Sequence, residues 1–287
     1  MKVNSQLKAF CPICKSKSIF YWGSAFDIGN PSIKHDIAKC YACTHLFVHP
    51  LPSVEYLYKA YKISDPSVYA DNGSLESRSI NPFSLGDNWV WKHITAFISP
   101  KRILDIGSAN ITQLERIVKL GWELTIVEPG AHAERIKKML QCSVYRGLFE
   151  EINFNNKFEI ISAIDVLEHV HSPVHFLKTV KSFLSENGIA LFRFPNSGSL
   201  RCKLEEETWE MLRPLGHLHY FSPRSIRRAC YLSNLKIIAL HSHDLRNYLS
   251  VNIGKIRIPQ SKFLYPFFKV LDLALLGDQL LMKVTHA

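Results

Sequence analysis

Apolar and polar positions follow two alternating periods between residues 101 and 196, and this pattern predicts strands and helices in turn. Short apolar runs predict buried strands at 101–107, 122–130, 142–147, from 157 and at 189–196. Amphipathic stretches with helical spacing predict helices between them, at 112–121, 131–141 and 172–188. The last of these has a Ser-Pro start and a Gly stop. The alternation predicts an α/β, doubly wound fold, with a parallel sheet and helices on both faces.

The segment before this core is less regular. Residues 51–98 are interpreted as a linker and helical bridge or lid, because helical spacing at both ends flanks a stretch rich in turn formers. Trp89 and Trp91 fit packing residues better than a ligand cage.

Four cysteines stand in two matched pairs near the start of the chain. Cys11 and Cys14 belong to the stretch CPIC, and Cys40 and Cys43 belong to CYAC, after 25 intervening residues. Two such pairs let four thiolates converge on one zinc ion with no open position for substrate, so we expect a structural zinc ribbon over residues 1–50. Disulfides and a redox pair are disfavoured, because the pairs are matched and the chain shows no export signal. The remaining cysteines are expected to be ordinary buried or half-buried thiols: Cys142, Cys202 and Cys230.

Composition and charge narrow the class of protein. The 287 residues are 47% hydrophobic and 21% charged, which is typical of a globular protein. A net charge of +10 favours anionic partners, namely nucleic acid, a membrane surface or phosphorylated substrates. The Lys and Arg residues are spread along the chain, which weakens the nucleic-acid interpretation. We see neither a signal peptide nor a run of roughly 20 apolar residues, and therefore expect a cytoplasmic protein without a transmembrane segment.

The chemically informative residues stand where predicted strands end. Asp105 ends the first strand and is followed by Gly107, which allows a ligand close to the backbone. Glu128 ends the second strand, where a carboxylate can accept hydrogen bonds from both hydroxyls of a ribose. Asp165 ends the fourth strand and Pro195–Asn196 the fifth. Because the carboxyl ends of parallel strands meet at one edge of a sheet, these residues predict a nucleotide-cofactor site.

Four stretches together resemble a class I S-adenosylmethionine-dependent methyltransferase, of the branch that includes ubiquinone-biosynthesis O-methyltransferases and bacterial sugar methyltransferases. They are LDIGSANITQLERIVKLGWELTIVEPG, FEIISAIDVLEHVHSPVHFLKTV, NGIALFRFPNSGSL and GHLHYFSPRSIRRAC, and they span most of residues 101–235. The front of the chain also resembles the zinc ribbon that precedes this domain in many such proteins. The resemblance implies a seven-stranded Rossmann-like sheet over residues 99–287 and S-adenosylmethionine as cofactor.

The resemblance also assigns cofactor contacts by position. The turn after the first strand would pass beneath the methionine part of the cofactor, and Glu128 would hold the ribose. Leu148 and Phe149 would flank the adenine, although Phe149 fits the core equally well. The loop after the fourth strand would line the transferring methyl group. The residues of this turn and this loop are Asp105, Gly107, Ser108, Ala109, Asp165, Val166 and Leu167.

Two positions depart from the family pattern, because most relatives have glycine where this chain has Ala109 and Ile111. Ala adds a single methyl group, whereas Ile is stiff and disfavours a positive φ. If the helix has already begun at Ile111, its φ is negative and the pocket stays functional. We favour this interpretation over that of a pseudoenzyme.

Histidines offer the base that a hydroxyl or an acidic carbon needs in order to accept a methyl group. His169 in LEHV follows the fourth strand, while His217 and His219 in GHLHYF precede a predicted helix on the substrate side. Each could instead satisfy a buried backbone group or cap the next helix. We expect His169 or His217 to act as the base, with His219 and Tyr220 as further candidates. A metal site on two histidines lacks an obvious third ligand in the sequence.

The most apolar run of the chain covers residues 262–276. Lys255, Arg257 and Lys262 precede or open it, so peripheral membrane contact through an interfacial helix stays open. A helix packed on the domain or on a second subunit is favoured, because the resemblance places a helix between the last two strands. The final antiparallel strand would then lie within residues 277–287.

These observations predict methyl transfer from S-adenosylmethionine to oxygen or carbon of a small-molecule acceptor. The resemblance suggests a sugar or nucleotide-sugar of surface-polysaccharide synthesis. One alternative is an RNA methyltransferase in which the ribbon and the positive charge bind phosphates. A second is an inactive, zinc-dependent scaffold. The sequence leaves the acceptor atom and the oligomeric state open.

Overall fold

The computed structural model describes residues 6–26, 32–55, 92–96, 101–107, 111–130, 132–140, 142–214, 216–243 and 272–287, with short pieces at 252–253, 256–257 and 270. Most of the expected bridge at 51–98, with Trp89 and Trp91, and most of the apolar run at 262–276 lie outside these residues. Among the residues that are described, no helix is both long and apolar enough to cross a membrane.

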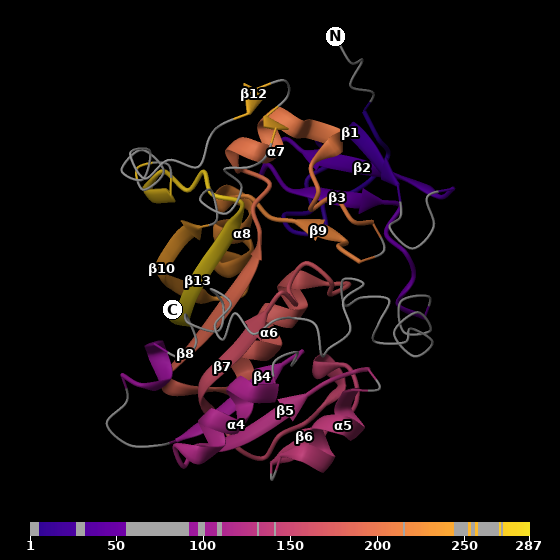
Figure 1. Ribbon diagram of the computed structural model, residues 1–287. Helices are drawn as coiled ribbons and strands as arrows, with labels where there is room; N and C mark the ends of the chain where they lie inside the picture. Colours follow the sequence, from indigo (N-terminus) through magenta and orange to yellow (C-terminus); the bar gives the residue numbers. More distant parts are fainter. Residues whose placement is uncertain are drawn as a thin grey trace.

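A seven-stranded sheet forms the larger part of the molecule, in the order β10-β13-β8-β7-β4-β5-β6 (Figure 1). Strands β8, β7, β4, β5 and β6 run parallel, and β13 runs antiparallel to both β8 and β10. Both the doubly wound parallel sheet and the final antiparallel strand are thereby confirmed. The strands are β4 (Arg102–Ile106), β5 (Glu123–Val127), β6 (Ser143–Tyr145), β7 (Phe158–Ile164), β8 (Leu184–Pro195), β10 (Leu235–His243) and β13 (Gln279–His286).

Helices cover both faces of this sheet. Consecutive residues of β4 point to opposite faces: Leu104 belongs to one buried cluster with Phe176 of α6, and Ile103 to another with Ile117 of α4. Burial on both faces explains why these strands are continuous apolar runs. The helices are α4 (Ile111–Lys119), α5 (His132–Met139), α6 (Pro173–Phe183), α7 (Leu200–Glu205) and α8 (Pro223–Leu232), with 3-10 turns η1 (Phe149–Glu151) and η2 (Glu206–Thr208).

A second sheet builds the ribbon that the cysteine pairs predicted. Strands β1 (Ile19–Phe26) and β2 (Lys34–Cys40) form a hairpin, and β3 (Leu46–His49) pairs with β2. The fourth strand, β9 (His219–Tyr220), comes from the distant GHLHYF stretch and pairs with β3 (Figure 1). The ribbon sheet is therefore completed by the same part of the chain that carries candidate site residues. A further small hairpin joins β11 (Asn252–Ile253) and β12 (Ile256–Arg257).

One predicted boundary is wrong, because α6 ends at Phe183 rather than at Gly188. Gly188 lies inside β8, where the pairing with β7 shifts register between Phe158 and Ile160. A Cβ on Gly188 would lie 2.9 Å from the Phe158 carbonyl oxygen. The glycine therefore permits a close approach of two strand backbones and does not stop a helix.

Replacing Gly188 by Ala is expected to destabilise the protein by about 1–3 kcal/mol, because the added methyl group overpacks a backbone contact. The free energy of unfolding, measured in urea, tests this. Asn187→Ala is the matched control, since Asn187 is exposed and adjacent. Equal stability of the two variants would contradict the close approach.

Candidate active site

Asp105 and Gly107 lie at the carboxyl end of β4, at the edge of the sheet where the ends of the parallel strands meet. The Ser162 hydroxyl on β7 donates a hydrogen bond to Oδ1 of Asp105. Gly107 has φ +71°, and its N–H donates to the Val127 carbonyl at 2.9 Å. A Cβ at Gly107 would lie 2.6 Å from Cγ2 of Val166. Glycine is thus required both by the backbone conformation and by the close passage of the loop after β7.

Glu128 lies at the same edge, directly after β5. Its Oε1 accepts a hydrogen bond from the Gly130 N–H at 2.7 Å. Burial raises the pKa of Glu128 to about 7, and the neighbouring charge of Asp105 also raises it. The carboxyl groups of Asp105 and Glu128 therefore lie at the same edge of the sheet, as their positions at strand ends predicted. We call this edge the rim.

The turn between these residues is described only in part. Ser108 and Ala109 lie outside the described residues, so their contacts with a cofactor stay predictions. Helix α4 begins at Ile111, which places this residue in the first helical turn. Helical residues have negative φ, so the backbone condition that the sequence analysis set for a functional pocket is met at position 111.

The loop after β7 is held by an ion pair. Arg193 of β8 donates through Nε to Oδ1 of Asp165 at 2.7 Å and through Nη2 to Oδ2. The Asp165 N–H donates in turn to the Arg193 carbonyl at 2.9 Å, with Asp165 at φ +57°. After Asp165, the side chain of Val166 packs against Gly107, whereas Leu167 is fully buried in the main core. Of the three loop residues expected at the methyl group, Leu167 thus packs inward.

Phe149 is part of the core. This is one of the two roles that the sequence leaves open for it. It is 3% exposed and packs edge-on against Phe176 and Phe183, with ring centroids 5.3 and 6.0 Å apart. Leu148 precedes it directly at the start of η1 and is half-buried. Leu148 is consequently the more accessible of the two residues expected near an adenine.

His169 and His217 meet beside this loop, with ring centroids 4.9 Å apart. Nδ1 of His169 lies 2.6 Å from the Gly216 carbonyl, and Nδ1 of His217 lies 2.9 Å from the Met211 carbonyl. A carbonyl only accepts, so each Nδ1 carries the proton. Burial lowers the pKa of His169, and burial lowers that of His217 to about 3. Both rings are therefore neutral at pH 7, with the lone pair on Nε2.

Glu168 joins this pair and was missed in the sequence, although it directly precedes His169 in LEHV. One ligand atom from each of Glu168, His169 and His217 lies within 4.8 Å of the others. Glu168 is 1% exposed, and its Oε2 has no hydrogen-bond partner within the described part of the chain. Burial raises its pKa well above the ordinary range, and the charge of Asp165 adds to the shift.

His219 lies apart from the other two candidate histidines. Its Nδ1 is 3.1 Å from Nε2 of His45 in the ribbon, and its Nε2 is 3.4 Å from the His171 carbonyl. Burial lowers the pKa of His219 to about 3. The same strand buries Tyr220 in a third cluster beside Trp209. His219 and Tyr220 thus connect the ribbon to the rest of the protein.

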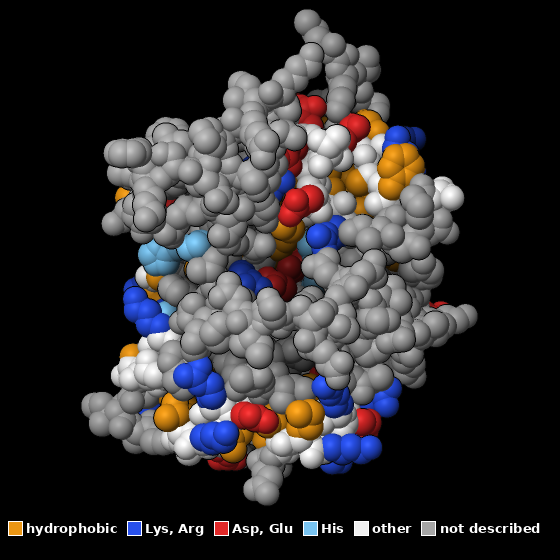
Figure 2. Space-filling model, viewed as in Figure 1, with side chains coloured by type: hydrophobic (Ala, Val, Ile, Leu, Met, Phe, Trp, Pro, Cys, Tyr) orange, Lys and Arg blue, Asp and Glu red, His pale blue; other side chains and the backbone are white. Residues whose placement is uncertain are grey.

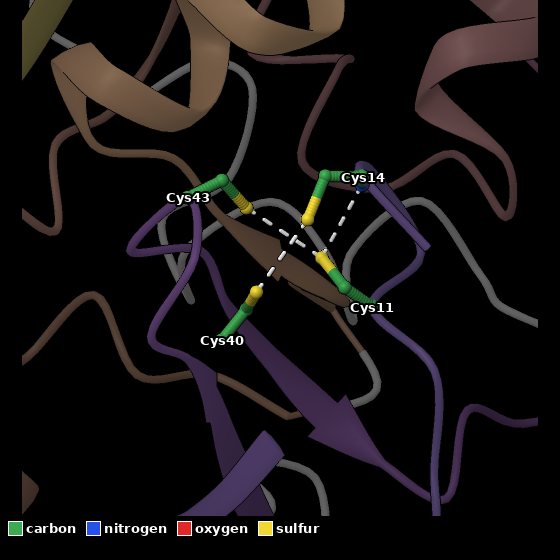
Figure 3. Close-up of side chains that lie close together, drawn as sticks. All are labelled: Cys11, Cys14, Cys40 and Cys43. Carbon is green, nitrogen blue, oxygen red and sulfur yellow. Dashed lines mark hydrogen bonds between the residues drawn. The ribbon is translucent and has the colours of Figure 1, made fainter. Parts of the chain in front are cut away.

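The four ribbon cysteines converge as their spacing predicted (Figure 3). The sulfur of Cys11 lies 3.6 Å from that of Cys43, and the sulfur of Cys14 lies 3.6 Å from that of Cys40. A tetrahedral zinc ion with Zn–S bonds of about 2.3 Å separates its sulfurs by roughly 3.8 Å. The hydrogen bond from Cys43 lowers the pKa of Cys11 to about 6, whereas burial raises the pKa of Cys40, and the hydrogen bond to Cys11 together with burial raises that of Cys43. The geometry therefore fits a closed four-cysteine metal site.

Charged side chains gather in a hollow between the two sheets. On the face shown in Figure 2, acidic atoms lie at its bottom, and Lys or Arg side chains stand beside them. The hollow lies midway between the ribbon and the end of the molecule that carries β4, β5 and β6.

Residues 90–240 match the family described as Methyltransferase domain, which is more than half of the chain. The chain belongs to this family. Its strand order, with β13 inserted antiparallel between β8 and β10, is that of the class I, S-adenosylmethionine-dependent methyltransferases.

Solved structures of methyltransferases share this fold at low sequence identity. The Burkholderia thailandensis 1,6-didemethyltoxoflavin-N1-methyltransferase, solved with 1,6-didemethyltoxoflavin and S-adenosylhomocysteine, is 13% identical, with a TM-score of 0.52 over 88% of this chain and 96% of that chain. A complex from Haloferax volcanii, of the Trm112 methyltransferase activator and a putative methyltransferase, is 13% identical, with a TM-score of 0.50 over 69% of this chain and 89% of that chain. No curated protein matches the chain.

Proposed function

We propose that this methyltransferase methylates oxygen or carbon of a small-molecule acceptor, with a sugar or nucleotide-sugar of surface-polysaccharide synthesis as the acceptor class. The observation that carries the proposal is a pair of buried histidines beside the loop after β7, next to the carboxylates at the strand ends. Asp105 and Glu128 supply the rim, and His169, in the loop after β7, packs edge-on against His217. The low identity to solved methyltransferases leaves the acceptor itself to experiment.

Each side of the site has a separate task. S-adenosylmethionine, when bound, supplies a methyl group on a positively charged sulfur. Glu128 accepts hydrogen bonds from its ribose, while the loop of Asp165 and Val166 positions the methyl group and excludes water. The acceptor must lose a proton, and His169 or His217, with the lone pair on Nε2, is the proposed base.

Zinc in the ribbon has a structural role in this proposal. Four thiolates complete a tetrahedral shell, so the ion presents no open position to a substrate. The ribbon instead contributes β3, which pairs with β9. Strand β9 begins two residues after His217. Zinc would therefore support the acceptor side of the site from a distance.

Replacing Glu128 by Gln is expected to weaken S-adenosylhomocysteine binding by roughly ten- to a hundredfold, the size of a lost charged hydrogen bond. Calorimetric titration of the folded protein measures the dissociation constant. Glu123→Gln is the matched control, because Glu123 is exposed at the opposite end of the same strand. No binding by the unchanged protein would contradict the enzyme and favour an inactive scaffold.

Binding of S-adenosylhomocysteine is expected to tighten as the pH rises from about 6 to 8. In the free protein the pKa of Glu128 is raised to about 7, and ribose hydroxyls would stabilise its ionised form. At pH 7 binding should therefore release about half a proton. Calorimetry in buffers of different ionisation enthalpy measures this release. Glu128→Gln should abolish it, and an unchanged release in that variant would show that another group titrates.

Removing zinc is expected to destabilise the whole protein and not the ribbon alone. A loss of about 3 kcal/mol would lower the Tm by roughly 6–12 °C for a chain of this size. Cys40→Ser should show this loss in thermal unfolding, whereas Cys142→Ser, outside the cluster, should not. A zinc-free protein with an unchanged Tm would contradict the structural role.

A further inference from the structure

The cluster of Glu168, His169 and His217 has the donor set of a metal site. Its three ligand atoms lie within 4.8 Å of one another. Two residues come from the loop after β7, and His217 comes from the segment before β9, 48 residues after His169. Two imidazoles with one carboxylate hold catalytic zinc and non-haem iron in proteins and leave further coordination positions open.

The two histidines are already in the protonation state that a metal requires. Each donates Nδ1–H to a backbone carbonyl, of Gly216 in one case and of Met211 in the other. This second hydrogen bond fixes the tautomer and ring orientation of metal-ligating histidines generally. The bare Nε2 lone pairs are then the atoms available to a cation.

Glu168 adds an observation of its own. Its side chain is 1% exposed, yet Oε2 finds no hydrogen-bond donor in the part of the chain that the structure describes. The charge of the neighbouring Arg193 favours the ionised form of Glu168, while its Nε and Nη2 donate hydrogen bonds to Asp165. A buried polar atom without a partner is costly, and a bound cation would give the ionised carboxylate of Glu168 the partner it lacks.

The backbone holds this arrangement in place before any ligand binds. The Glu168 carbonyl accepts hydrogen bonds from the N–H groups of Leu218 at 2.8 Å and His219 at 3.1 Å. The N–H of His169 donates to the Val166 carbonyl at 2.9 Å. The two segments that contribute ligands are thereby joined directly beside them.

We propose that Glu168, His169 and His217 bind a divalent transition-metal ion, zinc above all, with open positions for the acceptor. The ribbon site differs, because it offers only soft thiolates and a closed shell. The structure thus assigns this chain two metal sites of different chemistry, one of them beside the loop that would line the methyl group.

A catalytic use of this ion deepens the proposed function and rests on it, whereas metal binding itself does not. In the metal-bound protein the ion takes over the activation of the hydroxyl from His169 and His217, because their Nε2 lone pairs are then ligands. A hydroxyl bound to a divalent metal ion loses its proton near neutral pH, and the proton passes to solvent. The acceptor oxygen then forms a bond to the methyl carbon, while the carbon–sulfur bond breaks and leaves its electron pair on sulfur. The chemical class of acceptor is a hydroxyl compound, with a second oxygen able to chelate the ion.

The test is titration of Co²⁺ into protein whose ribbon is loaded with zinc. One equivalent is expected to bind with the weak visible bands of nitrogen and oxygen ligation and without a thiolate charge-transfer band. Glu168→Gln and His217→Gln should each weaken this binding at least about tenfold. His175→Gln and Glu186→Gln are matched controls, because both side chains are exposed outside the cluster.

Several outcomes overturn the proposal. They are no Co²⁺ binding beyond the ribbon, a thiolate spectrum for the second ion, or unchanged affinity in folded Glu168→Gln and His217→Gln. If these variants do not fold, pulsed EPR of Cu²⁺ in the unchanged protein decides, since coordinated imidazoles give distal-nitrogen couplings and their absence refutes the site. S-adenosylhomocysteine binding, measured on the same samples, separates failure of the metal site from failure of the methyltransferase function.

Discussion

The backbone junction at Glu168 is the interaction on which the active-site side of the molecule depends. Its carbonyl accepts hydrogen bonds from the N–H groups of Leu218 and His219, and so ties the loop after β7 to the segment that enters β9. Directly after β9, Phe221 forms a parallel bridge with Asn196 at the end of β8. Three elements thus converge within a few residues: the ends of β7 and β8, and the ribbon sheet. Because the junction is made by backbone atoms, it sets the position of His217 regardless of what binds there.

The ribbon shares a hydrophobic core with the methyltransferase fold. Cys11 and Cys40 belong to the same buried cluster as Phe176 of α6. At the other contact, the Thr44 hydroxyl lies 2.6 Å from that of Ser222, which caps the start of α8. A change in the ribbon is therefore transmitted by packing and hydrogen bonds to the segment that carries the candidate acceptor residues. Through these contacts the ribbon is connected directly to the segment that carries His217 and His219.

The sequence predicted most of the fold because its signals are local. Apolar runs marked the strands, and the residues that end them marked the rim of Asp105 and Glu128. The missed features depend on contacts between distant segments. The spacing of apolar and polar residues does not show that β9 completes the ribbon sheet, or that Glu168 meets His217. Gly188 was misread for the same reason, since a glycine that ends a helix and one that admits a neighbouring strand look alike in sequence.

The loss of glycines from the cofactor turn matters less than the sequence alone suggests. Glycine is required by conformation at Gly107, where φ is +71° and Val166 leaves no space for a Cβ. At Ile111 the helix has begun, and helical residues have negative φ, so this position does not require glycine. The rim carboxylates are held by Ser162 and Gly130, neither of which belongs to the turn. In the proposed function, the carboxylates at the strand ends hold the cofactor, and a shorter glycine pattern is compatible with this proposal.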